Sequence, residues 1–168
     1  VMLVSSGAVG VGMKTLGLEK RPTKLSAVQA LAALGQNKLM AMYQNECSKY
    51  GFNSAQLLLT ADDLKDRKRH LNVMNCIESL WSQDILPIVN ENDSVSVDEL
   101  KFGDNDTLAG LLATMTRSEL TIILTTVGGL HHKENNVLGE RISVVDNITG
   151  ELREMATGTD DAAFSVGG

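Results

Sequence analysis

The chain has 168 residues, and its 15 Lys plus Arg stand against 21 Asp plus Glu, a formal net charge of −6. This length predicts one domain, and the 43% hydrophobic content provides a core that needs no disulfide or metal. The negative balance argues against nucleic-acid binding, which requires clustered Lys and Arg. No stretch approaches the ~18 apolar residues of a membrane span, and Cys47 and Cys76 fit reduced thiols. We therefore expect a cytoplasmic protein.

Both ends of the chain indicate a larger protein. The sequence opens on the apolar run Val1-Met2-Leu3-Val4 and closes on the pair Gly167-Gly168. Domain termini are usually polar and frayed, whereas residues 1–4 have the pattern of a buried strand. We expect a chain that is truncated at both ends.

Strand and helix patterns alternate along the first half of the chain. Apolar residues recur at steps of three and four over residues 23–50, which predicts a helix, and Gly35 inside it marks a bend or a close contact. Thr60 followed by Asp63 predicts a capped helix start. The expected elements are a strand at 1–5, a helix from the turn at 5–10 to about 16, a helix over 23–50, a strand at 55–59, and a helix that continues, with a break, to about 82.

The second half continues the alternation less regularly. Pro87 lacks an N–H group, so we expect it at the start of its strand or on a sheet edge. The expected elements are a strand at 85–89, a short strand or hairpin at 96–101, a helix over 108–116 opened by residues 103–107, a buried strand at 120–124, a strand at 142–145 and a helix near 150–156.

This order of elements predicts an α/β fold with a mainly parallel sheet sandwiched by helices. Ligands of such sheets bind beyond the carboxyl ends of the strands. Small or polar loops stand at four predicted element ends, at residues 5–10, 90–94, 104–107 and 125–129. Their convergence favours an enzyme over a structural module.

Two kinds of loop chemistry stand out. The turn at 5–10 has backbone N–H groups that could bind an anion at a helix start, or it is only a tight turn; no P-loop motif is present. Seven acidic or amide residues lie in two loops within 17 positions: Asn90, Glu91, Asn92, Asp93, Asp104, Asn105 and Asp106. They could bind an ammonium group, hold Mg²⁺ or order lysines, or they are turns and helix caps. His131 and His132 have no partner at metal-ligand spacing, and we expect both on the surface.

Several of these motifs recur together in one known family. Residues 4–9 (VSSGAV), 35–36 (GQ), 56–60 (QLLLT), 87–95 (PIVNENDSV) and 99–108 (ELKFGDNDTL) closely resemble the glutamate 5-kinases of the amino-acid kinase family. Order and spacing match from residue 1 to about 130, and more loosely after that. The resemblance implies that residues 1–168 are the central part of one amino-acid kinase domain.

The resemblance also implies a reaction and a set of site residues. The reaction is transfer of the γ-phosphoryl group of ATP to the γ-carboxylate of L-glutamate, which gives glutamyl 5-phosphate in proline biosynthesis, with Mg²⁺ as cofactor. By position, the glutamate-binding residues are Ser6, Asn90, Asp93 and Asn105. Asp106 matches the aspartate that orders two catalytic lysines, and the residues along the nucleotide are Thr125, Thr126, Gly167 and Gly168. No residue is assigned to a metal. A homo-oligomer and feedback inhibition by proline are further family expectations.

The chain departs from the family pattern at the nucleotide side. The two family lysines are expected before Val1 and after Gly168, so we expect this chain alone to be inactive, and Thr126 replaces a family aspartate. An alternative is a non-catalytic glutamate- or proline-sensing module, or a decayed kinase domain. A third possibility is the kinase portion of a bifunctional pyrroline-5-carboxylate synthase, although the motifs at 90–93 and 101–106 look closer to the stand-alone enzyme.

Overall fold

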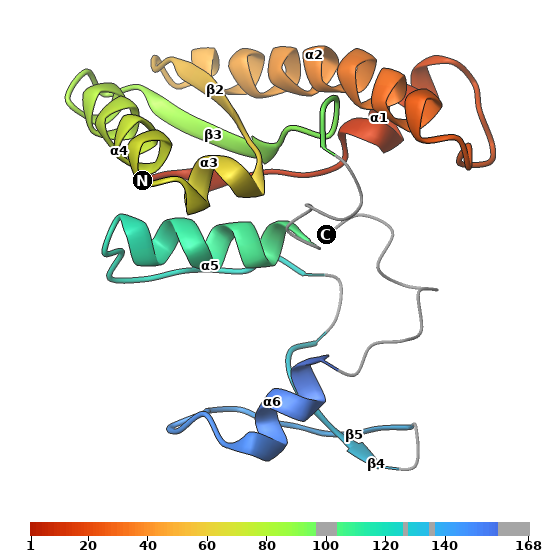
Figure 1. The fold of residues 1–168 in the computed structure, drawn as a ribbon, viewed down its shortest axis with the longest axis vertical. Coiled ribbons are helices and arrows are strands. Elements are labelled where there is room, and N and C mark those ends of the chain that lie inside the picture. Colours follow the sequence, from red (N-terminus) through yellow and green to blue (C-terminus); the bar gives the residue numbers. More distant parts are fainter. Residues whose placement is uncertain (97–103, 126–127, 135–136, 158–168) are drawn as a thin grey trace. The chain divides into compact units, whose positions relative to one another are not determined.

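The computed structural model describes residues 1–96, 104–125, 128–134 and 137–157, which fall into two compact units divided after Thr121 (Figure 1). We call residues 1–121 unit 1 and the residues from 122 on unit 2. Unit 1 contains, in chain order, β1 (Leu3–Val4), α1 (Ala8–Thr15), α2 (Leu25–Lys49), β2 (Ser54–Leu59), α3 (Ala61–Lys65), α4 (Arg67–Trp81), β3 (Leu86–Glu91) and α5 (Asn105–Met115). Unit 2 contains β4 (His131–Glu134), β5 (Val137–Arg141) and α6 (Gly150–Thr157).

The sheet of unit 1 has the order β1-β3-β2, and both pairings are parallel. Leu3 is paired with Ile88, and Leu57 is paired with Val89. The predicted parallel sheet is therefore confirmed. Pro87 is the second residue of β3, as expected for a strand start, but β3 is the middle strand and not an edge.

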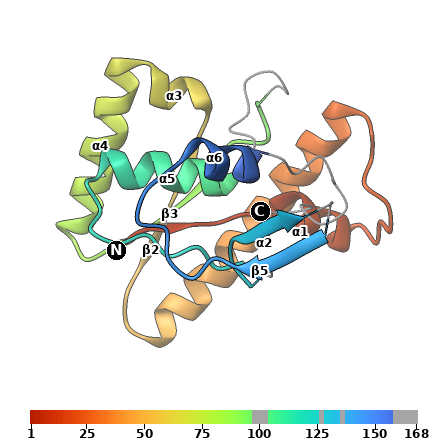
Figure 2. The same cartoon turned by 90° about the horizontal axis from the view of Figure 1, so that it is seen from below.

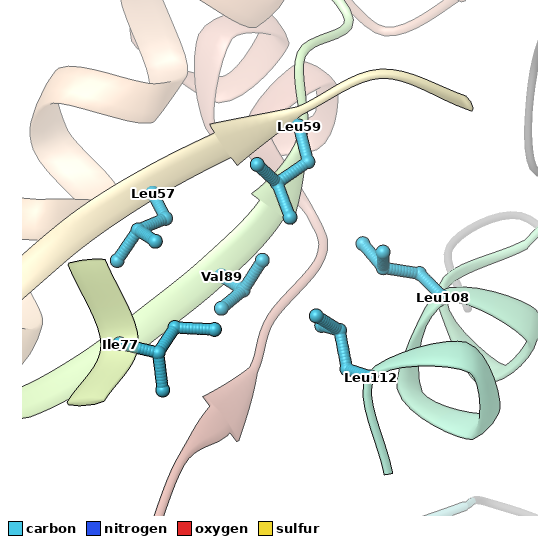
Figure 3. Close-up of a cluster of buried hydrophobic side chains, with 6 residues drawn as sticks. All are labelled: Leu57, Leu59, Ile77, Val89, Leu108 and Leu112. Atoms are coloured by element: carbon cyan, nitrogen blue, oxygen red, sulfur yellow. The ribbon is translucent and has the colours of Figure 1, made fainter. Parts of the chain in front are cut away.

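Helices cover both faces of this sheet (Figure 1). Successive residues of a strand point to opposite faces, so Leu57 and Leu59 face the core while Gln56 and Leu58 face the other way. Figure 3 shows the core side, where strand residues meet residues from α4 and α5. The buried members of this cluster are Leu57, Leu59, Ile77, Val89, Leu108 and Leu112. The opposite face carries the polar side chains that form the site below.

Two glycines bring α1 against α2, and the two helices lie side by side in both views (Figures 1 and 2). A Cβ atom on Gly12 would overlap the carbonyl group of Leu31, and one on Gly35 would overlap the carbonyl oxygen of Ala8. Only glycine permits backbones to approach this closely. The expectation that Gly35 marks a close contact is confirmed.

The helix predicted after Thr60 is two helices, α3 and α4, with the expected break between them. The Asp63 carboxylate accepts hydrogen bonds from the backbone N–H of Thr60 (2.8 Å) and from its hydroxyl (2.6 Å). At the break, Asp66 accepts a hydrogen bond from the Arg69 backbone N–H (2.8 Å) and caps α4. Both helix starts are therefore fixed by side chains that the sequence supplies locally.

Two strand predictions are wrong. Residues 120–124 form no strand in the described structure, and the Leu120 and Leu124 side chains are 75% and 89% exposed. The strand predicted at 142–145 is also absent there, because β5 ends at Arg141 and pairs in an antiparallel hairpin with β4. An apolar run becomes a strand only where another strand supplies backbone partners, and neither run has such a partner among the described residues.

Other predicted elements fare differently. Helix α6 is confirmed, and α5 begins at Asn105, three residues before the predicted start. Most of the segment at 96–101 lies outside the described residues. His132 is exposed as expected, while His131 is half-buried and its Nδ1 lies 2.9 Å from the carbonyl oxygen of Gly139. None of the helices in the described ranges combines the length and the apolar character needed to cross a membrane.

Candidate functional site

A pocket of about 330 Å³ opens in unit 1, at the carboxyl ends of β2 and β3. This volume is at the small end of the range for ligand pockets. The lining residues are Ala8, Ala32, Ala33, Gln36, Asn37, Gln56, Leu58, Glu91, Asn92, Asp93 and Ser94. The pocket therefore lies where a parallel sheet is expected to hold its ligand.

The pocket has an apolar side and a polar side. Alanines of α1 and α2 and Leu58 of β2 form the apolar side. The loop after β3 contributes two carboxylates, Glu91 and Asp93, and among the described lining residues none is basic. Glu91 is 8% exposed and accepts a hydrogen bond from the Ser96 hydroxyl (3.2 Å). This charge suits a ligand that carries a cationic group.

Four amide side chains form a continuous hydrogen-bonded series, which we call the amide chain. Asn105 Nδ2 donates to Asn90 Oδ1 (3.0 Å), and Asn90 Nδ2 donates to Gln36 Oε1 (2.9 Å). Gln36 Nε2 then donates to Gln56 Oε1 (3.2 Å). The amide chain thus joins the start of α5, the end of β3, α2 and β2 on one face of the sheet.

Asn105 also ties α5 to β1, because its Nδ2 donates a second hydrogen bond to the Ser5 carbonyl oxygen (2.7 Å). Its Oδ1 is buried and has no hydrogen-bond partner among the described residues. Buried polar atoms are nearly always paired, so an orphan acceptor of this kind indicates a donor that arrives with a ligand or water. The structure therefore brings the two acid-amide loops together at Asn90 and Asn105.

The start of α1 borders the same pocket through Ala8. Gly7 precedes the helix with a φ of 92°, a left-handed conformation that favours glycine, and no described side chain caps this end. The first N–H groups of a helix lack intrahelical partners and can bind an anion. Ser6 is half-buried in the turn before Gly7, and the neighbouring Ser5 hydroxyl lies 2.9 Å from the Tyr43 hydroxyl.

The remaining predicted site residues are dispersed. Asp93 lines the pocket and is half-buried, whereas Asp106 is exposed on the first turn of α5. Thr125 is exposed in unit 2. Thr126, Gly167 and Gly168 lie outside the described residues.

Three pocket residues were not predicted as site residues: Gln36, Gln56 and Glu91. Each stands inside a motif that carries the family resemblance, so the motifs marked their positions but gave them no role. Their contacts span 20 to 54 residues of sequence, a separation that no local spacing reveals. In the part of the chain that the structure describes, no group of three or more His, Cys, Asp or Glu could hold a metal ion.

Comparison with known proteins agrees with this architecture. The family model described as "Amino acid kinase family" matches residues 1–165. A protein of Thermoanaerobacter sp. (strain X514) named glutamate 5-kinase is 44% identical over 158 residues, which cover 93% of this chain and 42% of that protein. One of Myxococcus xanthus (strain DK1622) with the same name is 41% identical over 169 residues, covering 99% of this chain and 45% of that protein. The chain thus spans less than half the length of these relatives. From its match over residues 1–165 and its helix-covered parallel sheet, the chain belongs to the amino acid kinase family.

Proposed function

We propose that the protein to which this chain belongs is an ATP-dependent glutamate 5-kinase, and that residues 1–168 are the central part of its kinase domain. A γ-carboxylate oxygen of L-glutamate attacks the γ-phosphorus of ATP, and the bond from that phosphorus to the bridging oxygen breaks. The products are glutamyl 5-phosphate and ADP. Relatives named glutamate 5-kinase, at 41–44% identity over nearly the whole chain, support this reaction.

The observation that carries the proposal is the composition of the pocket. A glutamate zwitterion needs a counter-charge for its ammonium group and neutral or positive donors for its two carboxylates. Asp93 supplies the counter-charge, and the buried, unpaired Asn105 Oδ1 is a further acceptor for an ammonium N–H. Ser6 and Asn90 complete the proposed glutamate site, and the uncapped start of α1 adds N–H groups for a carboxylate.

The catalytic side of the proposal rests on the family resemblance. Asp106 orders the two family lysines, which neutralise charge on the transferred phosphoryl group. Thr125, Thr126, Gly167 and Gly168 lie along the nucleotide. Mg²⁺ accompanies the ATP phosphates in such reactions. The described residues offer no cluster of metal ligands, so we assign no residue of this chain to the ion.

Regulation and setting complete the proposal. The family resemblance suggests a homo-oligomer that is inhibited by proline. Cys47 and Cys76 are free thiols, which suits a cytoplasmic location.

The experiment uses a chimaeric enzyme, in which these 168 residues replace the matching stretch of the Myxococcus xanthus protein. Hydroxylamine traps an acyl phosphate, so we expect hydroxamate that depends on both ATP and L-glutamate. Asp93→Asn removes the proposed counter-charge and should raise KM for glutamate about 10- to 100-fold, since charged hydrogen bonds contribute about 1.5–3 kcal/mol. Asp62→Asn, on an exposed position of α3, is the matched control and should leave KM unchanged.

Three results would count against the proposal. Glutamate binding by calorimetry without hydroxamate would favour the sensing or decayed module. An unchanged KM in Asp93→Asn would remove Asp93 from the site. A folded chimaera that neither binds glutamate nor forms hydroxamate would refute the assignment to this reaction.

A further inference from the structure

We propose that Gln36 and Gln56 are substrate-binding residues, which present amide N–H groups to a carboxylate of the ligand in the pocket. The inference deepens the proposed function and rests on it. Both side chains line the pocket, Gln36 from α2 and Gln56 from β2. Neither has been given a role by any sequence motif discussed above.

The direction of the amide chain is set by backbone groups, whose donor and acceptor identities are fixed. The Glu91 N–H donates to the side-chain oxygen of Asn90 (2.9 Å), so that oxygen must face Glu91. The Ser5 carbonyl oxygen accepts from Asn105, so the Asn105 nitrogen must face Ser5. Asn90 and Asn105 therefore cannot exchange their oxygen and nitrogen atoms without losing a backbone hydrogen bond.

This direction passes from Asn90 to the pocket. Asn90 is 1% exposed, so its nitrogen cannot turn to solvent and needs the Gln36 oxygen as acceptor. The Gln36 nitrogen must then point to Gln56, whose oxygen accepts from it. The Gln56 nitrogen is left with no hydrogen bond to the described residues, and Gln36 retains its second N–H.

The pocket needs donors of this kind. Glu91 and Asp93 make it acidic, and among its described lining residues there is no lysine or arginine to meet a ligand carboxylate. Amide nitrogens of Gln36 and Gln56 are neutral donors, so they can bind a carboxylate without being drawn into an ion pair with those acids. Acceptors on the β3 loop and donors on α2 and β2 together match a zwitterion.

The close approach of α1 and α2 explains why the position is rigid. Gly35, the residue before Gln36, packs against the Ala8 carbonyl group with no room for a Cβ atom. Gln36 is 7% exposed and its side chain is held at both ends. A donor that is already oriented costs less entropy on binding than one that must be ordered.

The test measures binding by calorimetry to the 168-residue chain. The ligands are L-glutamate, 4-aminobutyrate (which lacks the α-carboxylate) and L-2-aminobutyrate (which lacks the γ-carboxylate). Gln56→Met removes the donor at an exposed position, so folding should persist, and affinity for L-glutamate should fall about tenfold. Affinity for the analogue that lacks the contacted carboxylate should stay unchanged, which also identifies that carboxylate. Gln56→Glu keeps the acceptor for Gln36 but replaces donors by a negative charge, so it should lower L-glutamate affinity further.

Gln44→Met is the matched control. Gln44 is on the same helix and also bonds β2, through the Ser54 backbone N–H (3.1 Å), but it does not line the pocket. This variant should leave all three affinities unchanged. Equal losses for all three ligands in Gln56→Met, no loss for L-glutamate, or the same losses in Gln44→Met would each overturn the inference. A folded wild-type chain that binds none of the ligands would instead overturn the proposed function, and the inference with it.

Discussion

Unit 1 and unit 2 both contain apolar runs, but only unit 1 buries them. Ile77, Leu108 and Leu112 of unit 1 have no exposed surface, whereas Ile122 and Leu124 of unit 2 are 71% and 89% exposed. No described side chain of unit 2 is buried. The strands of unit 1 have parallel neighbours from distant parts of the sequence, while unit 2 has a single hairpin. Burial in this chain therefore follows from long-range strand pairing more than from local hydrophobicity.

The largest expected effect tests this difference directly. Leu112→Ala removes a fully buried side chain from the core between β3 and α5, and should lower the free energy of unfolding by about 2–5 kcal/mol. Leu124→Ala, the same change at an exposed position of unit 2, should change it by less than about 0.5 kcal/mol. Urea unfolding followed by fluorescence of the single tryptophan, Trp81, reports on unit 1 because Trp81 packs against its core. Equal losses in both variants would show that the contrast between the units is wrong.

A smaller effect is expected at the contact of α1 with α2. Gly35→Ala forces a Cβ atom into the Ala8 carbonyl group, and overpacking against backbone should cost about 1–3 kcal/mol. Gly10→Ala is the matched control on α1, where a Cβ atom meets nothing within 4 Å. That variant should stabilise by about 0.5–1 kcal/mol, since alanine favours helix. Thermal unfolding by circular dichroism separates the two, and a tolerated Gly35→Ala would mean that α1 can move away from α2.

The smallest effect concerns helix starts, and it depends on pH in unit 1 only. Burial raises the pKa of Asp63, but hydrogen bonds from the Thr60 hydroxyl and backbone N–H, with the nearby charge of Arg69, outweigh it and hold the pKa below 3.8. The ionised form therefore stabilises the fold above the unfolded pKa, and this contribution is lost as pH falls through the folded pKa. Asp63→Asn should cost about 1 kcal/mol at pH 7.

The difference between wild type and Asp63→Asn should shrink in urea unfolding at pH values below 3.8. In unit 2, the Thr149 hydroxyl accepts from the Leu152 backbone N–H (3.2 Å) at the start of α6. Thr149→Val removes that cap without removing a charge, so its cost should not change with pH. A cost of Asp63→Asn that stays constant down to pH 3 would contradict the assignment of the ionised carboxylate as the stabilising form.

The sequence predicted those parts of the fold whose causes are local. The helix around Gly35 follows from apolar spacing, and the start of α3 follows from Thr60 and Asp63 three residues apart. Leu120–Leu124 has the same local pattern as a buried strand, yet forms none in the described structure. The pattern states that a segment could pair, but the partner is decided elsewhere in the chain.

The site shows the same division. The acid-amide motif predicted that the loops at Asn90 and Asn105 matter, and these two side chains are joined by a hydrogen bond. The roles of Ser6, Asp93 and Asp106 stay predictions. Gln36 and Gln56 escaped because their importance comes from contacts between α2, β2 and β3. Helix periodicity placed Gln36 on α2 but could not show that it meets the end of a strand 54 residues away.

The amide chain has one further consequence, for acidity. Its four side chains contain no ionisable group, so protons that titrate Glu91 or Asp93 cannot reverse the direction of its hydrogen bonds. A drop in pH would change the charge that the pocket offers while its shape stayed the same. Such a separation lets acidification weaken a ligand's hold without dismantling the frame that receives it.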